Sequence, residues 1–226
     1  MEGPILVTGA AGRVGGVGRT LTELLLKQGK AVSAMVRNED ERAQTLRDMG
    51  AELVVGNLLD LNSMHRVIAG CETMYFGMSV SDSYLAATVN TAVVAKHHGV
   101  KAFINMSQMT LAQMSVTETT PSPQHKLQWL SEQTLNWSGL PVVHVRPTVL
   151  LEGFVLISTP ESVREKNQIR LPFGEGKTSP GRGGGRCPRD HHAARESGAA
   201  HRQDLSPDRS AVGEHAFLRT GVFEGA

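Results

Sequence analysis

The sequence predicts an α/β protein built on a doubly wound parallel sheet. Short runs of β-branched and other apolar residues alternate with helical stretches over the first 150 residues, which is the pattern of repeated strand–helix units. A glycine-rich turn separates the first apolar run from the first helix. The 226 residues, of which 40% are hydrophobic, can form one such domain but leave little room for a second.

Six strands are predicted from short apolar runs bounded by turn-forming residues, and five helices from apolar residues that repeat on one face. The predicted strands are residues 4–8, 31–36, 52–55, 73–76, 102–106 and 142–145. Four of the predicted helices are residues 13–28, 40–49, 83–98 and 124–137, and Gly29 ends the first of them. A further helix is predicted to start at Asn62 and Ser63 and to end at Gly70. In such a sheet we expect ligands at the carboxyl ends of the strands.

The turn after the first strand has the glycine spacing of a dinucleotide-binding loop. It reads Thr8-Gly9-Ala10-Ala11-Gly12-Arg13-Val14-Gly15. Gly9 permits a tight turn, Gly12 lets the backbone approach a pyrophosphate, and Gly15 lets the helix pack closely on the strand. The phosphates would lie at the positive end of the following helix. An ATPase-type phosphate loop ending at Gly18 is disfavoured, because Arg13 stands where its first glycine should be and Arg19 replaces its lysine.

The end of the second strand favours NADP(H) over NAD(H). NAD enzymes place Asp or Glu there to bind the ribose 2′-hydroxyl, whereas this strand ends at Met35-Val36-Arg37. Arg37 can bind a 2′-phosphate through its guanidinium fork, and Arg13 can approach the same group from the turn. The alternative is that both arginines are ordinary solvated surface residues.

Residues at the other strand ends complete the predicted cofactor site. Asn57 follows the third strand and can bond an adenine edge, although a plain turn explains it nearly as well. Gly77-Met78-Ser79 and Met106-Ser107-Gln108 follow the fourth and fifth strands. The residues expected to bind the cofactor are Thr8, Gly9, Gly12, Arg13, Val14, Gly15, Arg37, Asn57, Leu58, Gly77, Met78, Ser79, Met106 and Pro147.

Together these motifs resemble the NmrA-like branch of the atypical short-chain dehydrogenase/reductase family. The resemblance covers about residues 4–180 and implies a Rossmann fold that binds NADP(H). Some family members look like quinone or dye reductases, and others are redox-sensing regulators that bind the cofactor without turning it over. Asn57 stands where the family usually has Asp. The matching segments are the glycine turn, Val36-Arg37, Gly56-Asn57-Leu58 with Asp60, Asn105-Met106-Ser107 and Val145-Arg146-Pro147-Thr148.

The usual catalytic pair of short-chain dehydrogenases, a tyrosine four residues before a lysine, is absent. The only tyrosines are Tyr75 and Tyr84, followed at that spacing by Ser79 and Thr88. Aligned by Glu132 and Leu135, the two family positions fall on Gln124 and Gln128, neither of which can donate a proton with a suitable pKa. We therefore expect His125 to donate a proton, Lys126 to hold the nicotinamide ribose, and Ser107 to take part in catalysis. The alternative for His125 and Lys126 is a solvated first turn of a helix.

Two functions stay open. The first is a reductase that passes hydride from NADPH to a small electron-poor acceptor such as a quinone or dye, which needs little help from a tuned acid. The second is a non-catalytic NADP(H)-dependent regulator. Absence of the tyrosine–lysine pair favours the regulator, whereas a crevice with Met106, Met109 and Met114 favours the enzyme.

Charge and composition disfavour other classes of partner. Lysine and arginine number 23 against 22 acidic residues, a net charge of +1, so we expect neither a nucleic-acid nor a membrane partner. Two cysteines, no transmembrane-length apolar run and no signal peptide predict a soluble cytoplasmic protein. A homodimer or a regulatory protein partner stays open. We predict no metal site, because adjacent His97 and His98 cannot share one helix face.

Residues 181–226 differ in composition from the rest of the chain. They contain eight of the 24 glycines and seven arginines, but no Lys, Ile, Asn, Met, Tyr or Trp. We therefore divide the chain into a cofactor domain over 1–150, a partial substrate lobe over 151–180, and a frameshifted, poorly ordered tail over 181–226. The C-terminal lobe would then be truncated or aberrant. A natural disordered Arg/Gly tail that binds RNA is the rival interpretation.

The frameshift hypothesis can be tested on paper. Permitted codons for residues 181–191, read from their second base, encode V-A-A-E-D-V-A-R-V-I, which is the start of an amphipathic helix. The same shift over residues 201–209 yields I-G-K-I-Y-H-L-T-G, a strand-like segment. Both resemble C-terminal segments of the family, and the helix and strand that should cover the substrate crevice would be missing from this chain.

Overall fold

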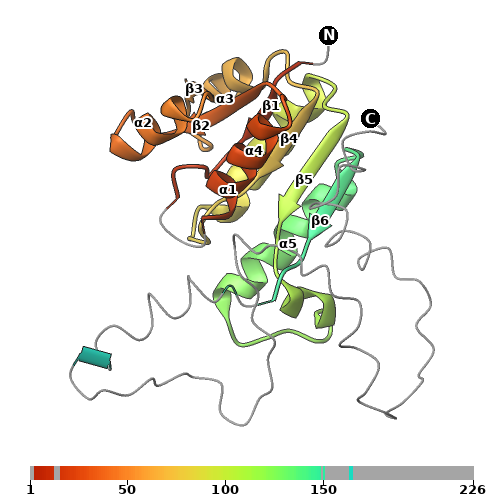
Figure 1. The fold of residues 1–226 in the computed structure, drawn as a ribbon. Coiled ribbons are helices and arrows are strands. Elements are labelled where there is room, and N and C mark those ends of the chain that lie inside the picture. Colours follow the sequence, from red (N-terminus) through yellow and green to blue (C-terminus); the bar gives the residue numbers. More distant parts are fainter. Residues whose placement is uncertain (1–2, 13–15, 149, 151–162, 165–226) are drawn as a thin grey trace, which may run out of the picture.

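The computed structural model describes residues 3–12, 16–148, 150, 163 and 164 and confirms the predicted doubly wound sheet (Figure 1). Six parallel strands lie in the order β3-β2-β1-β4-β5-β6, with the switch point between β1 and β4. Four of the six predicted strands have the bounds expected from the sequence, and the first two are slightly shorter. The strands are β1 (Ile5–Val7), β2 (Val32–Val36), β3 (Glu52–Val55), β4 (Thr73–Phe76), β5 (Ala102–Met106) and β6 (Val142–Val145).

Helices cover both faces of the sheet, each with its own apolar core. Leu21, Leu25 and Leu46 join the core under α1 (Val17–Lys27) and α2 (Glu41–Asp48). The opposite core lies under α3 (Leu61–Ile68), α4 (Tyr84–His97) and α5 (Pro123–Trp137), and it includes Phe76 and Phe103. A short 3-10 helix, η1 (Met109–Gln113), precedes α5 and was not predicted. Because each helix runs back across the sheet, the loop after every strand opens at one edge.

The first helix begins later than the sequence predicted. We expected helix from residue 13, but α1 starts at Val17, and Gly16 before it has a left-handed backbone with φ of 59°. That conformation ends any helical run from residue 13 and suits glycine because no Cβ is present.

The start of the third helix also differs from the prediction. Asp60, rather than Asn62 or Ser63, caps α3, and its side chain accepts a hydrogen bond from the N–H of Asn62. Aspartate is a strong N-cap because its carboxylate pairs with the unpaired N–H groups of the first turn. Ser63 is therefore free to contact the turn after β3.

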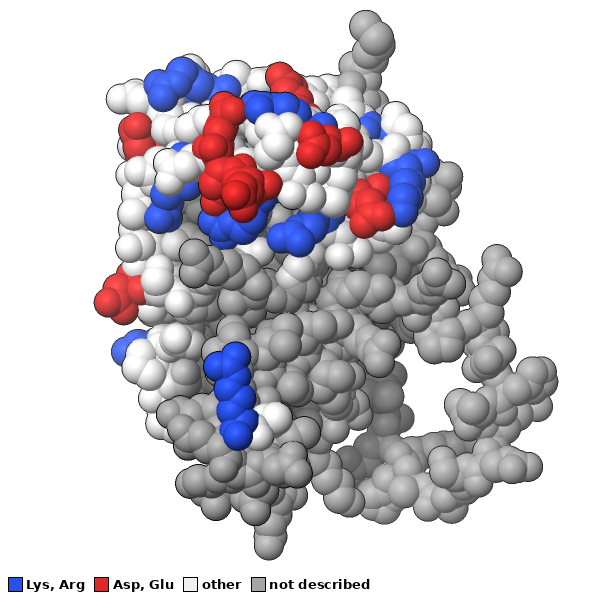
Figure 2. All heavy atoms as spheres, turned by 60° about the vertical axis from the view of Figure 1, so that its left-hand side comes forward, with Lys and Arg blue, Asp and Glu red and all other residues white. Residues whose placement is uncertain are grey.

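The regions predicted as a partial substrate lobe and a frameshifted tail, 151–180 and 181–226, lie outside the described residues except for Val163 and Arg164. Among the residues that the structure describes, no helix is long and apolar enough to cross a membrane. On the face shown in Figure 2, basic and acidic side chains are interspersed rather than gathered by sign.

Candidate functional site

The switch point between β1 and β4 is closed by a pair of reciprocal hydrogen bonds. The Thr8 hydroxyl accepts from the N–H of Gly77 at 2.9 Å and donates to the carbonyl of Gly77 at 3.1 Å. Gly9 follows with φ of 69°, and a Cβ at this position would lie 2.4 Å from the Gly77 carbonyl oxygen. The turn can therefore approach β4 only because residue 9 is glycine.

Gly18, to which the sequence analysis gave no packing role, packs closely against the glycine turn. Gly18 lies in the first turn of α1, and a Cβ there would stand 3.0 Å from the Cα and N of Ala10 and from the carbonyl oxygen of Gly9. Gly12 donates its N–H to the same carbonyl at 3.0 Å. Five residues separate Gly18 from Gly12 in the sequence. Arg13, Val14 and Gly15 lie outside the described residues.

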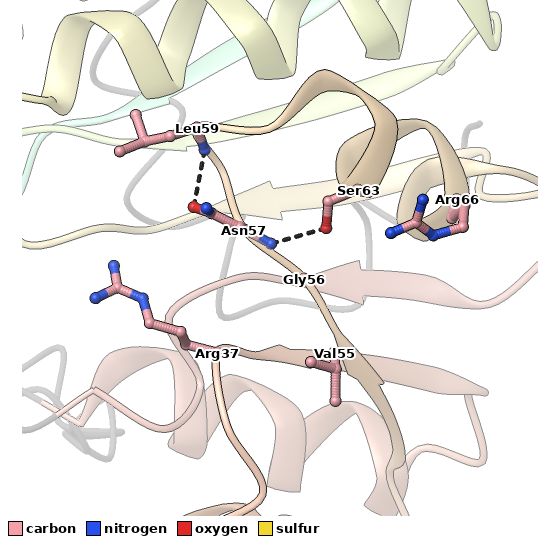
Figure 3. Close-up of a pocket in the computed structure, with 7 residues that line it drawn as sticks. All are labelled: Arg37, Val55, Gly56, Asn57, Leu59, Ser63 and Arg66. Atoms are coloured by element: carbon pink, nitrogen blue, oxygen red, sulfur yellow. Dashed lines mark hydrogen bonds between the residues drawn. The ribbon is translucent and has the colours of Figure 1, made fainter.

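A hollow of about 430 Å³ opens beside the ends of β2 and β3 (Figure 3). Arg37 reaches into it from the end of β2, which lies next to β3 because the N–H of Gly56 bonds the Val36 carbonyl at 2.9 Å. Neither Arg37 nor Arg66 has an ion-pair partner in the part of the chain that the structure describes. The hollow is lined by Arg37, Val55, Gly56, Asn57, Leu59, Ser63 and Arg66.

Asn57 lines the hollow and also holds the turn after β3. Its side-chain oxygen accepts from the N–H of Leu59 at 3.1 Å, while its own N–H donates to the Ser63 hydroxyl at 2.9 Å (Figure 3). These bonds agree with the turn interpretation of Asn57, and its contact with an adenine stays a prediction. Leu58 is fixed by the Asn90 side chain, which donates to its carbonyl at 3.2 Å.

Arg66 is a lining residue that the sequence interpretation missed. It lies three residues after Ser63 on α3, so both side chains occupy one helix face toward the turn after β3. That spacing after a Gly-Asn turn is the signal that could have identified it.

Arg42 is a second arginine that the sequence interpretation missed. It joins the glycine turn to the start of α2, because its guanidinium donates to the Ala11 carbonyl at 3.1 Å and to the Asp40 carboxylate. The Arg42 guanidinium and the backbone N–H of Ala43 lower the pKa of the Asp40 carboxyl. Its pairing with Asp40 makes Arg42 a positioning residue for the turn.

At the end of β5, Ser107 lies where a substrate would meet the sheet edge. Its N–H bonds the Val145 carbonyl at 2.8 Å, and its buried hydroxyl oxygen has no hydrogen-bond partner among the described residues. Beside it, the Gln108 side-chain amide donates to the carbonyl oxygen of Gln128. Gln128, which the sequence analysis aligned with the family lysine, is buried.

Tyr84 lies under the same strand end but is a poor proton donor. Its hydroxyl donates to the Met106 carbonyl at 3.4 Å. Burial raises the pKa of Tyr84 to about 12, an effect that Glu132 strengthens and a hydrogen bond with Gln128 opposes. A general acid that acts near neutral pH needs a much lower pKa.

His125 and Lys126 lie in the first turn of α5, which begins at the edge of the sheet where β5 ends. The His125 ring is half-buried, with Nδ1 3.0 Å from the Thr120 hydroxyl, whereas Lys126 is exposed. Among the described residues, no hydrogen bond joins either side chain to Ser107. Their roles in catalysis therefore stay predictions.

The remaining predicted site residues lie at the same edge. Met106 and Met78 are half-buried, Ser79 is exposed, and the Pro147 carbonyl accepts from the N–H of Met109 at 2.9 Å. The three methionines predicted to line one crevice differ in burial, because Met114 is buried and Met109 is exposed.

A buried ion pair fixes the segment after β6. Arg146 donates two hydrogen bonds to Glu132 on α5, at 3.0 and 2.8 Å, and Glu132 is only 1% exposed. His144 lies nearby, accepting from the Asn105 amide and donating to the Asn136 side chain, both at 3.0 Å. Burial lowers the pKa of His144, with Glu132 acting against this change. This network positions Pro147 at the site.

The chain is similar in sequence and fold to proteins described as NAD(P)H-dependent reductases. The chain is 24% identical over 177 residues to an NAD(P)H azoreductase from Xenophilus azovorans, covering 77% of this chain and 57% of that protein. It has the fold of an NADPH-dependent quinone oxidoreductase from Escherichia coli complexed with NADPH, with a TM-score of 0.60, 24% identity, and coverage of 71% and 54%. A triphenylmethane reductase from Citrobacter sp. gives a TM-score of 0.58 and 25% identity, covering 71% and 53%.

The chain thus spans little more than half the length of these relatives. A model of the NAD(P)H-binding family matches residues 9–170, which include the glycine turn from Gly9 onward and the strands β2 to β6. This match is consistent with the resemblance to NmrA-like short-chain dehydrogenases expected from the sequence. From the glycine turn to residue 170, the chain belongs to the NAD(P)H-binding family.

Proposed function

We propose that the protein is an NADPH-dependent reductase that reduces a small electron-poor acceptor such as a quinone or dye. The observation that carries the proposal is the hollow at the ends of β2 and β3, which is lined by Arg37 and Arg66, two positive charges without an ion-pair partner among the described residues. The relatives described as an azoreductase, a quinone oxidoreductase and a triphenylmethane reductase support the class of acceptor.

The residues at the sheet edge fit a bound dinucleotide. Gly9 and Gly12 expose backbone where a Cβ would crowd a carbonyl oxygen, so the turn can lie close to a pyrophosphate. Arg37 would bind the 2′-phosphate through a charge-assisted hydrogen bond, which is stronger than a bond to the neutral ribose hydroxyl of NAD(H). Asn57 would contact the adenine through its free amide hydrogens.

At the other end of the site, Ser107 has a buried hydroxyl without a partner among the described residues, so it can orient the nicotinamide amide or the acceptor. The bound cofactor supplies a hydride. His125 would hold the proton that completes reduction of the acceptor, and Lys126 would bind the nicotinamide ribose. A quinone or cationic dye places little demand on this proton donor because it is already electron-poor.

A non-catalytic NADP(H) sensor is the second candidate, and the hydrogen-bonded pair of Gln108 and the buried Gln128 favours it. The resemblance places the family lysine at Gln128, and neither of these amides can act as an acid. Such a protein would bind NADPH without consuming it.

Steady-state turnover distinguishes the two candidates. The full chain is mixed with NADPH and, one at a time, a benzoquinone, a naphthoquinone, an azo dye and a triphenylmethane dye, and loss of NADPH absorbance is followed. We expect steady consumption with at least one acceptor and a decrease in rate when His125 is replaced by Gln. NADPH binding measured by calorimetry, without consumption across the set, would contradict the reductase and support the sensor.

A further inference from the structure

Three histidines from two helices meet between α3 and α4. His65 lies in the last turn of α3, His97 is the last residue of α4, and His98 caps that helix. Both helices end at this point, and both run opposite to the strands, so the cluster lies at the edge of the sheet away from the cofactor site. The prediction of no metal here considered only the adjacent His97 and His98, and the structure adds His65 from a second helix.

The ring nitrogens of these histidines are close enough to share one ion. One nitrogen from each ring can be chosen so that all three lie within 4.8 Å of one another. His98 Nε2 and His65 Nδ1 are 3.0 Å apart. With Zn–N bonds of 2.0–2.1 Å, a tetrahedral site needs nitrogens about 3.3 Å apart. The nitrogens of His98 and His65 already have nearly this separation. The His97 ring is exposed and can rotate toward these two nitrogens.

The surroundings favour a cation bound to neutral imidazoles. Two helix C-termini, each with a partial negative charge, point toward the cluster. Metal ions bind the neutral form of the imidazole ring. The ammonium of the adjacent Lys96 is hydrogen-bonded to the Gly139 carbonyl at 2.8 Å.

We propose that His65, His97 and His98 form a binding site for a divalent transition metal of the zinc class, which joins α3 to α4. Three imidazole nitrogens leave one coordination position for water, as in three-histidine zinc sites. Imidazole selects zinc, nickel and copper over the hard ions magnesium and calcium. Because the ion bonds two helices in the folded chain only, its binding stabilises the folded state.

Calorimetric titration of the chelator-treated full chain with Zn²⁺ tests the proposal. We expect one equivalent to bind, Mg²⁺ to give no heat, and Zn²⁺ to raise the melting temperature. His65→Ala should weaken Zn²⁺ binding at least tenfold and abolish the increase in melting temperature. His65 is exposed, so the melting temperature of the metal-free chain should be the same with and without His65→Ala. If His65→Ala lowers that temperature, His97→Asn is the second variant.

A control is needed because Cys187, His191 and His192 could also bind zinc. The triple variant Cys187→Ser, His191→Ala, His192→Ala should bind Zn²⁺ within twofold of the unaltered chain. The proposal is overturned if Zn²⁺ gives no heat, if His65→Ala and His97→Asn both bind normally, or if the triple variant alone loses the site.

Discussion

The hydroxyl of Thr8 and the peptide groups of Gly77 satisfy one another at the end of two adjacent strands. Thr8→Val keeps the shape of the side chain but leaves the buried Gly77 N–H and carbonyl without these bonds. We expect the free energy of unfolding to decrease by about 1–3 kcal/mol, the cost of an unsatisfied buried polar group. Urea denaturation measures the change. Thr8→Ser should retain most of the stability, and equal losses for Val and Ser would contradict the role of the hydroxyl.

Gly18 is predicted to be the glycine on which the cofactor turn depends. Gly18→Ala would place a Cβ 3.0 Å from three backbone atoms of Gly9 and Ala10, so the turn must move. We expect a loss of about 1–3 kcal/mol in the free energy of unfolding and weaker NADPH binding. Gly50→Ala is the control. The φ of 100° at Gly50 makes alanine costly for the backbone. Apart from its chain neighbours, no described residue has an atom within 4 Å of a Cβ added there, so the cofactor turn should be unaffected. Normal NADPH affinity in Gly18→Ala would refute the assignment.

The sheet could be predicted from the sequence because each strand is a short apolar run with a turn at both ends. Residues 52–55, 73–76, 102–106 and 142–145 therefore have their expected bounds. The start of α1 differs from the prediction because Gly16, with its left-handed backbone, precedes the helix, and a contact such as that of Gly18 with the turn depends on the folded chain. The glycine pattern indicates a dinucleotide loop but does not determine which glycine lies against the turn.

The residues that the sequence analysis missed are placed by contacts between elements that are distant in the sequence. The location of Arg37 beside the hollow could be predicted, because the end of a strand has a fixed place in the fold. The location of Arg66 depends on how α3 packs beside the turn after β3. The approach of His65 to His98 depends on α3 and α4 lying side by side. Helical periodicity identifies the inward face of each helix but not its neighbour.

Arg37 is predicted to set the preference for NADPH over NADH. Arg37→Asp replaces a phosphate-binding group with a repelling charge, so NADPH affinity should fall at least tenfold while NADH affinity changes little. Arg66→Ala should cause a smaller loss with NADPH. Fluorescence titration with both cofactors measures these effects. Arg47→Ala is a matched control, because Arg47 pairs with Glu39 and does not line the hollow. Equal losses for NADPH and NADH in Arg37→Asp would contradict the prediction.

His144 is predicted to make the folded state less stable in mild acid. Burial lowers its pKa in the folded protein from the ordinary 6.5, so the unfolded chain binds a proton first as the pH falls. The free energy of unfolding should therefore be highest above about pH 7 and decrease below about pH 6.5. Protonation of Nδ1 also breaks the bond from Asn105. His144→Gln should reduce this pH dependence in urea denaturation. His98 has a pKa lowered in the same direction, so His98→Gln is the comparison. An unchanged slope in His144→Gln would rule out this contribution.

The coding DNA provides the test for residues 181–226, which we propose are translated in a shifted frame. The family match ends at residue 170, before this change of composition. We expect the DNA, read one base further on, to encode V-A-A-E-D-V-A-R-V-I from codon 181 and I-G-K-I-Y-H-L-T-G from codon 201. The first has acidic residues where a helix N-terminus favours them, and the second has strand-like character. A chain expressed from the restored frame should melt at a higher temperature than this one, because it adds a helix and a strand over the substrate crevice. Codons that give stops or unrelated residues in that frame would reject the shift and leave the Arg/Gly tail as a natural segment.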